Sequence, residues 1–192
     1  MRKIQSGLLF VALGLLAGAV DAQEPTRVRG TIAAVEDSVL SVSSAGGGNT
    51  AIQLTEKTAI VFSQPIAIGE IKPGDFVGVT SAKGADGTLT AFEIRRFPKP
   101  SNPGHRPFQG RDDQTMTNAT VSAMVEAASG RELTLTYDGG AQKVLVSEKA
   151  AVSTLVPGNR SQLVPGAPVN LTARAGDGGT LTAIGIQVGP PK

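Results

Sequence analysis

The stretch "GADGTLTAFEI" (residues 84–94) returns almost unchanged as "GDGGTLTAIGI" (residues 176–186), 92 positions further along the chain. At this offset, 15 of the 43 positions from 52 to 94 are identical to their counterparts, and no gap is needed. Upstream, "GTIAAVEDSVLSVSS" corresponds to "ATVSAMVEAASGRELTLTY" with small length differences in two turns. Self-similarity at this spacing indicates a tandem duplication of a domain of roughly 70 residues.

Each copy predicts five short strands joined by glycine-containing turns. In the first copy the strands are residues 27–35, 39–43, 50–55, 76–81 and 88–95, and the second copy repeats the pattern. Apolar residues alternate with polar ones, as in Leu40 with Val42 and Val121 with Ala123 and Val125, which is the period of a half-buried strand. Turns such as "DGG" and "KPGD" supply residues that adopt positive φ or fix φ.

The repeated closing segment contains a slip in this alternation. Apolar positions run from Leu89 and Ala91 to Phe92 and Ile94, and the second copy slips at the same place. A β-bulge near Ala91 and Ala183 explains the slip and bends the last strand around a small barrel. We therefore predict an all-β protein of two tandem five-stranded OB-like barrels joined by a Pro-rich linker. The expected boundaries are 1–22 for a signal peptide, 23–97 and 117–192 for the barrels, and 98–116 for the linker.

The amino-terminal residues are typical of a secretory signal. "MRK" is followed by "GLLFVALGLLAGAV", and Val20 and Ala22 stand at the small-residue positions of a cleavage site. The alternative is an uncleaved anchor, but the apolar run is short for a span of about 20 residues. Cleavage after Ala22 predicts a periplasmic or secreted protein with no remaining membrane span. The chain has no cysteine, so no disulfide can form.

The linker concentrates basic residues. The whole chain carries a formal net charge of +2, which falls to about +1 without residues 1–22. Four prolines in the linker exclude a helix or a central strand and favour an extended connector. Its functional interpretation is a docking strip for an envelope protein or an anionic polymer; the alternative is a solvated connector. The candidate partner-binding residues are Arg95, Arg96, Lys99, Arg106, Phe108 and Arg111.

Catalytic signals are missing. The single histidine, His105, lies in the linker, and no glycine-rich loop precedes a helix. We expect no enzyme activity, no cofactor and no identifiable small-molecule substrate. A metal site is not expected; weak candidate ligands are His105, Asp112 and Asp113. Nucleic-acid binding is not expected either, because the chain has no tryptophan and one tyrosine for base stacking.

The combined pattern "GTIAAVEDSVLSV", "TEKTAI", "IKPGDFVGVT" and "GTLTAFEI" resembles a family of exported bacterial domains of unknown function, often in tandem and expected to form small barrels. Some similar chains are labelled metal-transporter permeases, a role that one cleavable apolar stretch does not support. The resemblance brings no catalytic motif. We therefore expect a non-catalytic periplasmic binding module; the alternative is a soluble metal-handling or transporter-associated periplasmic protein.

Overall fold

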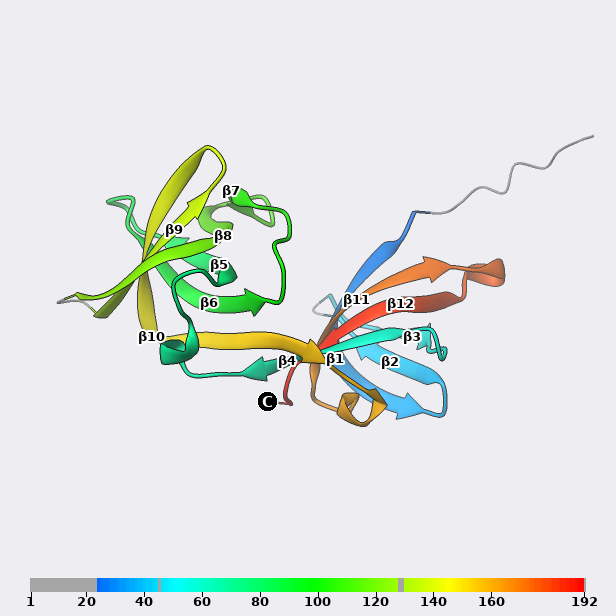
Figure 1. The fold of residues 1–192 in the computed structure, drawn as a ribbon. Helices are drawn as coiled ribbons and strands as arrows, with labels where there is room; N and C mark the ends of the chain where they lie inside the picture. The colour runs from blue at the N-terminus through cyan, green and yellow to red at the C-terminus, as the bar shows by residue number, and fades with distance from the viewer. Residues whose placement is uncertain (1–23, 45, 128–129, 192) are drawn as a thin grey trace, which may run out of the picture.

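The computed structural model describes residues 24–44, 46–127 and 130–191, so the predicted signal peptide lies outside the described residues. Within these residues the chain forms twelve β-strands and three 3-10 turns. The strands build two barrels that lie side by side (Figure 1). The all-β class is confirmed.

The first barrel combines strands from the two ends of the chain. It contains β1 (Thr26–Glu36), β2 (Val39–Ser43), β3 (Asn49–Gln53), β11 (Pro168–Ala175) and β12 (Leu181–Val188). Strand β2 pairs antiparallel with β1 and with β3, its neighbours in the sequence. Strand β3 pairs parallel with β12, and β11 pairs antiparallel with both β12 and β1. The ring therefore closes in the order 1-2-3-12-11, which is the connectivity of an OB-like barrel.

The second barrel is built in the same way from the middle of the chain. It contains β5 (Phe76–Lys83), β6 (Leu89–Phe97), β8 (Arg111–Ala127), β9 (Gly130–Tyr137) and β10 (Gly140–Pro157). β8, β9 and the start of β10 pair antiparallel, β10 pairs parallel with β6, and β5 closes the ring between β6 and β8. Both barrels therefore have a closed five-stranded ring.

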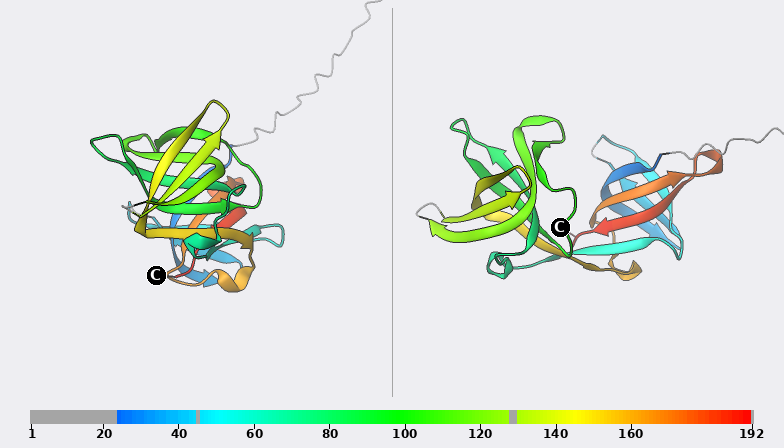
Figure 2. Two further views of the ribbon diagram at one scale, coloured as in Figure 1. Left: turned by 60° about the vertical axis from the view of Figure 1, so that its left-hand side comes forward. Right: turned by 45° about the horizontal axis from the view of Figure 1, so that its top comes forward.

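Two strands cross between the barrels, and we call them the crossover arms: β4 (Ala59–Pro65) and residues 151–157 of β10. The arms pair antiparallel, with Ser63 opposite Leu155, its own counterpart in the second copy. Each arm then passes through a 3-10 turn, η1 (Ile68–Glu70) or η2 (Arg160–Gln162), into the opposite barrel. The third turn, η3 (Asp177–Gly179), joins β11 to β12. The second view of Figure 2 shows the arms passing between the barrels.

The prediction that each copy closes its own barrel, with boundaries 23–97 and 117–192, is therefore wrong. Strands β5 and β6 of the first copy complete the barrel of the second copy, and β11 and β12 complete the barrel of the first. In Figure 1 blue and cyan strands share a barrel with orange and red ones. The physical reason is that the copies present the same strand pattern, so closing within a copy or across copies buries equivalent side chains. The crossover arms carry the last two barrel strands of each copy into the opposite barrel.

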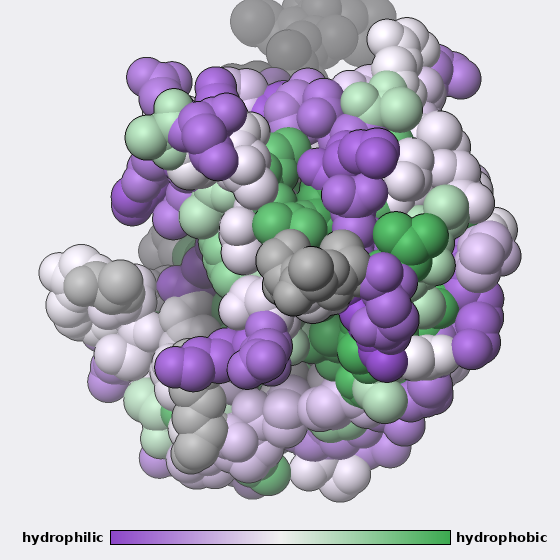
Figure 3. Space-filling view, turned by 90° about the vertical axis from the view of Figure 1, so that its left-hand side faces the viewer, coloured by the Kyte–Doolittle hydropathy of each residue, from purple (hydrophilic) through white to green (hydrophobic). Residues whose placement is uncertain are grey.

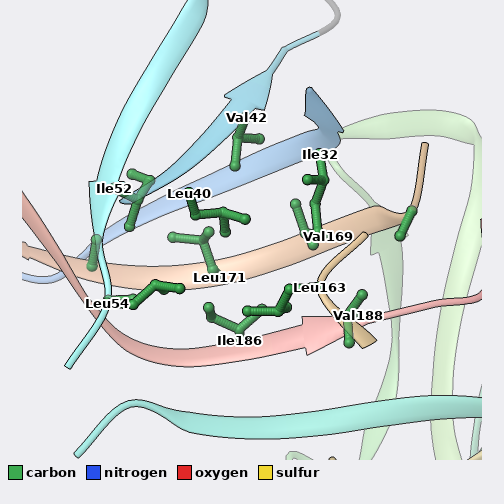
Figure 4. Packing of buried hydrophobic residues seen from close by; sticks show 13 residues of the cluster. Ile32, Leu40, Val42, Ile52, Leu54, Leu163, Val169, Leu171, Ile186 and Val188 are labelled. Atoms are coloured by element: carbon green, nitrogen blue, oxygen red, sulfur yellow. The ribbon is translucent and has the colours of Figure 1, made fainter. Parts of the chain in front are cut away.

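The two cores show the same exchange at the level of side chains. In the first barrel Ile32, Leu40 and Ile52 of one copy pack with Leu171 and Ile186 of the other, all nearly or fully buried (Figure 4). The second core joins side chains of β5 and β6 to side chains of β8, β9 and β10. Neither copy can leave the other without exposing both cores to water, a cost of about 1.5–3 kcal/mol for each large aliphatic side chain.

The predicted bulges are confirmed. Ladder pairing shifts beside Ala91 and beside Ala183, and the extra residues, Phe92 and Ile184, are 38% and 40% exposed. A second bulge in each copy was not predicted. In β8 it lies between Val121 and Ala123 and turns Met124 against the core, which leaves Val125 49% exposed.

The linker prediction needs correction, because much of 98–116 is regular structure. β7 (Gly104–Phe108) and the start of β8 form a hairpin through Gln109 and Gly110, both with positive φ. Such a pair suits a two-residue turn. β7 lies at the end of the strand order, so Pro107 occupies an edge strand, where a missing N–H donor is tolerated.

Candidate functional site

A groove lies where the second barrel, the β7 hairpin and the first strand of the first barrel meet; we call it the arginine groove. Its volume is about 360 Å³. Strands β1, β5, β6, β7 and β8 line it, and all except β7 contribute alternate residues, which face the same side of a strand. The lining residues are Arg27, Arg29, Gly78, Thr80, Glu93, Arg95, Phe97, Arg106, Pro107, Phe108, Gln109, Met116 and Asn118.

Arg95 occupies a partly buried position in this groove. Its side chain is 26% exposed and forms an ion pair with Glu93 on the same strand face. Its Nε is buried and has no hydrogen-bond partner among the described residues. A buried donor left without a partner costs about 1–3 kcal/mol, and more when the group is charged. Arg95 therefore brings to the groove a guanidinium group whose Nε–H is left unsatisfied by the described residues.

The floor of the groove is held by close packing and by the linker. Asn118 Nδ2 donates to the carbonyl oxygens of Ser101 and Asn102, at 3.2 and 3.0 Å. The ring of Phe97 lies over Gly78, where a Cβ would come within 2.7 Å of Phe97 Cε2. These contacts fix the loop before β7 against the outer face of the barrel, and they position Arg106 and Phe108 on β7.

The charge of the groove is strongly positive. Arg27 and Arg29 are exposed on β1, Arg106 is exposed on β7, and the half-buried Arg95 lines the same groove. Glu93 is the one carboxylate among the described residues that line it. Guanidinium groups bind carboxylate and phosphate in a planar, bidentate manner. The groove is therefore suited to an anionic group, with Phe97 and Phe108 available for an apolar contact.

The structure brings together three of the six predicted partner-binding residues: Arg95, Arg106 and Phe108. Lys99 is exposed in the bend after β6, outside the groove. Arg111 is exposed and makes a two-pronged contact with Asp113, at 2.9 and 2.7 Å. That ion pair raises the pKa of Arg111 and lowers the pKa of Asp113.

Arg96 has a structural role instead. Its guanidinium donates to the Glu70 carbonyl oxygen at 3.1 Å and to Thr154 Oγ1 at 3.3 Å, and it lies 3.6 Å from Asp75 Oδ2. It therefore ties β6 to the η1 turn and to the second crossover arm. Neighbouring arginines on one strand point to opposite faces, which separates Arg95 from Arg96 in function.

Sequence reasoning missed Arg27, Arg29, Gly78 and Asn118. The spacing "RVR" in β1 was a usable signal, because residues two apart share a strand face. The sequence could not predict that Arg27 and Arg29 come close to the linker, because this depends on the position of the first barrel against the second.

His105 and Asp112 line a different cavity, of about 490 Å³, at the mouth of the second barrel. His105 Nδ1 lies 2.8 Å from Thr117 Oγ1, and burial, followed by the nearby Lys83, lowers the pKa of His105. Asp113 is paired with Arg111 and does not line this cavity. No group of three or more potential metal ligands occurs in the part of the chain that the structure describes.

A third cavity, of about 370 Å³, lies against η1, and its lining mixes apolar residues with the charged Glu126, Arg131 and Glu148. Ile66, Ile68, Val146 and Val152 line it, and the same side chains pack against the second core. Figure 3 faces this end of the molecule and shows hydrophobic side chains exposed between hydrophilic ones. We interpret the cavity as part of the packing of η1 onto the barrel.

Comparison of the chain with protein-family models, with curated proteins and with solved structures found no match in any of the three. None of the described residues form a helix of the length and apolarity needed to cross a membrane. Function is therefore inferred from the geometry of the sites.

Proposed function

We propose that the protein is a non-catalytic binding module of the bacterial periplasm whose arginine groove binds a carboxylate-bearing segment of an envelope protein. The observation that carries this proposal is the convergence of Arg27, Arg29, Arg95 and Arg106 on one groove. Four like charges in one cavity repel one another in the free protein, and an anionic partner relieves that repulsion. Localisation in the periplasm is supported by the signal-like residues 1–22.

The aromatic residues of the groove favour a protein segment over a simple polyanion. Phe97 and Phe108 are half-buried and line the groove beside the arginines. Aromatic side chains contribute strongly to protein interfaces, and a polymer of anionic groups alone gives them no apolar partner. An acidic segment with an apolar side chain matches both features.

The test compares two triple variants that remove the same charge. In the first, Arg27, Arg95 and Arg106 are changed to Gln; in the control, Lys99, Arg160 and Arg174, which lie outside the groove, are changed to Gln. Binding of a glutamate-rich peptide that contains a leucine, and of polyphosphate, is measured by calorimetry at about 0.15 M salt. Each lost charge-assisted hydrogen bond contributes about 1.5–3 kcal/mol, so we expect at least tenfold weaker peptide binding in the groove variant alone.

Equal weakening in both triple variants would show a general charge effect and would contradict the proposal. Tighter binding of polyphosphate than of the peptide would point to a polymer ligand instead. Capture of envelope proteins by the wild type, with loss in the groove variant and retention in the control, then identifies the partner. The unfolding midpoint of each variant is measured alongside, so that loss of binding is separated from loss of fold.

A further inference from the structure

The cavity at the mouth of the second barrel is separate from the arginine groove. Along β7, His105 and Pro107 alternate with Arg106 and Phe108, so the two pairs face opposite sides of the hairpin. His105 lines the mouth cavity, whereas Arg106 and Phe108 line the groove; Pro107, at the sheet edge, touches both. The two cavities therefore lie on the two faces of one edge strand.

One residue of the mouth cavity's wall carries a buried hydroxyl group without a partner among the described residues, and a second such hydroxyl lies beside it in the ladder, outside the cavity lining. Thr115 lines the cavity and is 7% exposed, and its Oγ1 has no hydrogen-bond partner in the described part of the chain. Its ladder partner on β5, Ser81, is fully buried, and the Oγ of Ser81 is unsatisfied in the same way. Buried polar groups in proteins are nearly always paired, so an unpaired hydroxyl on a cavity wall indicates a ligand or water partner.

The remaining lining supplies both donors and acceptors with no net charge. Lys83 and Asp112 carry opposite charges, and Gln114 and Gln142 each present an amide. The pKa of His105 is lowered by burial and by Lys83, which favours its neutral imidazole. Gln142 Nε2 lies 3.3 Å from the Tyr137 hydroxyl, to which it donates, and this contact orients the amide. Leu89 and Pro107 add apolar surface.

Comparison of the two copies shows that this chemistry is specific to the second barrel. At the 92-residue offset, Ser81 and Lys83 correspond to Ala173 and Ala175, and Gln142 corresponds to Thr50. The barrel scaffold is shared, so the polar groups at the second mouth are not required for closing a barrel. They instead mark a feature that one copy gained or the other lost.

We propose that the mouth cavity is a second binding site and that it takes a small, neutral, polyhydroxylated molecule, namely a saccharide. Sugars present alternating donors and acceptors, which match the mixed hydroxyl, amide and ionic lining, and their C–H faces match Leu89 and Pro107. The cavity volume of about 490 Å³ lies within the range of about 300–1,000 Å³ typical of small-molecule sites. The arginine groove, with its excess positive charge, does not share this chemistry.

The experiment titrates the protein from residue 23 to residue 192 with N-acetylglucosamine, maltose and glycine. Binding is followed by changes in the protein's NMR chemical shifts. The variants are Thr115→Val and Gln142→Leu; the control is Thr50→Val, at the counterpart of position 142 in the first barrel. A neutral hydrogen bond contributes about 1 kcal/mol, so we expect saturable saccharide binding that weakens about fivefold in each cavity variant and is unchanged in the control. Thr115→Val removes an unpaired buried hydroxyl without changing shape, so the unfolding midpoint is expected to stay the same or rise.

Three results overturn the proposal: no saturable saccharide binding, tighter binding of glycine than of either sugar, or equal sugar affinity in wild type and Thr115→Val. The groove variant with Arg27, Arg95 and Arg106 changed to Gln is titrated in parallel and is expected to bind the sugar normally. The proposals for the arginine groove and for the mouth cavity are therefore tested independently of each other.

Discussion

At the scale of single residues, the two copies diverge in a complementary way around the arginine groove. In the second barrel Gly78 leaves room for the ring of Phe97, which also contacts Phe76 at a centroid distance of 6.3 Å. The counterparts of Gly78 and Phe97 in the first barrel are Asn170 and Gly189, so the small and the large residue have changed places. The large ring that shapes the groove is therefore present in one copy and accommodated by a matching glycine.

The environment of His105 predicts how the free energy of unfolding depends on pH. Burial lowers its pKa below the ordinary value of 6.5, and Lys83 on β5 lowers it further; Asp112 on β8 lines the same cavity. The unfolded chain then binds more protons than the folded chain below pH 6.5. The contribution of neutral His105 to the free energy of unfolding is therefore complete above pH 6.5. It is lost as the pH falls through the lower pKa that His105 has in the folded state.

We therefore expect the free energy of unfolding to fall more between about pH 7.5 and pH 5 in the wild type than in His105→Asn. Urea unfolding at several pH values measures this. Asparagine keeps a polar group near Thr117 without a titrating proton, so the variant controls for the lost hydrogen bond. Parallel pH dependence of the two proteins would contradict the assignment.

At the scale of elements, one threonine decides where a strand ends. In the first copy β3 and β4 are separate, and Thr58 Oγ1 accepts from the Thr55 amide at 2.9 Å and donates to the Ala183 carbonyl at 3.0 Å. The counterpart of Thr58 is Ala150, and there β10 continues with a shift in pairing between Val146 and Ala151. A local side-chain hydrogen bond thus competes with the strand ladder in one copy and is absent from the other.

Changing Thr58 to Ala is expected to lower the free energy of unfolding by about 1 kcal/mol, because two hydrogen bonds are lost from a turn. Amide hydrogen exchange of Thr55 should accelerate, since its N–H loses its acceptor. Ala150→Thr serves as the reciprocal control and should leave the exchange rate of Thr55 unchanged. Unaltered exchange in Thr58→Ala would show that the turn is held by other contacts.

At the scale of the whole molecule, the exchange of strands makes the two barrels interdependent. A barrel of about 70 residues is marginal in isolation. Here each core contains residues from both copies, so neither barrel can open without exposing side chains such as Leu171 or Leu133. The arms, paired around Ser63 and Leu155, add a direct ladder between the copies.

Cleavage between the copies is therefore expected to leave the protein assembled. A protease site replaces residues 98–100, after β6 and before the carbonyl groups that Asn118 binds. After complete cleavage the two fragments should elute together in size-exclusion chromatography and separate once denaturant is added. Thermal unfolding of the intact chain should show one transition. Separation of folded fragments without denaturant would mean that each copy closes its own barrel.

Much of this architecture follows from local pattern. The duplication, most strands of the barrels, the glycine turns and the bulges beside Ala91 and Ala183 depend on residues close together in the chain, and their alternation was readable. Strand β7 was not predicted: the prolines excluded a central strand from the linker, and its place at a sheet edge became visible only in the structure. The second bulges were missed because Val121, Ala123 and Val125 alternate regularly in sequence, while the ladder shifts between them.

What the sequence by itself determined is the repeated β unit, with its strands, its turns and the basic character of the linker. Tertiary structure alone decided which strands close which barrel, because two similar copies offer equivalent contacts within and across themselves. Tertiary structure also decided the arginine groove. Arg27 and Arg29 meet Arg95 and Arg106 across about 70 residues of chain because the first barrel lies against the second.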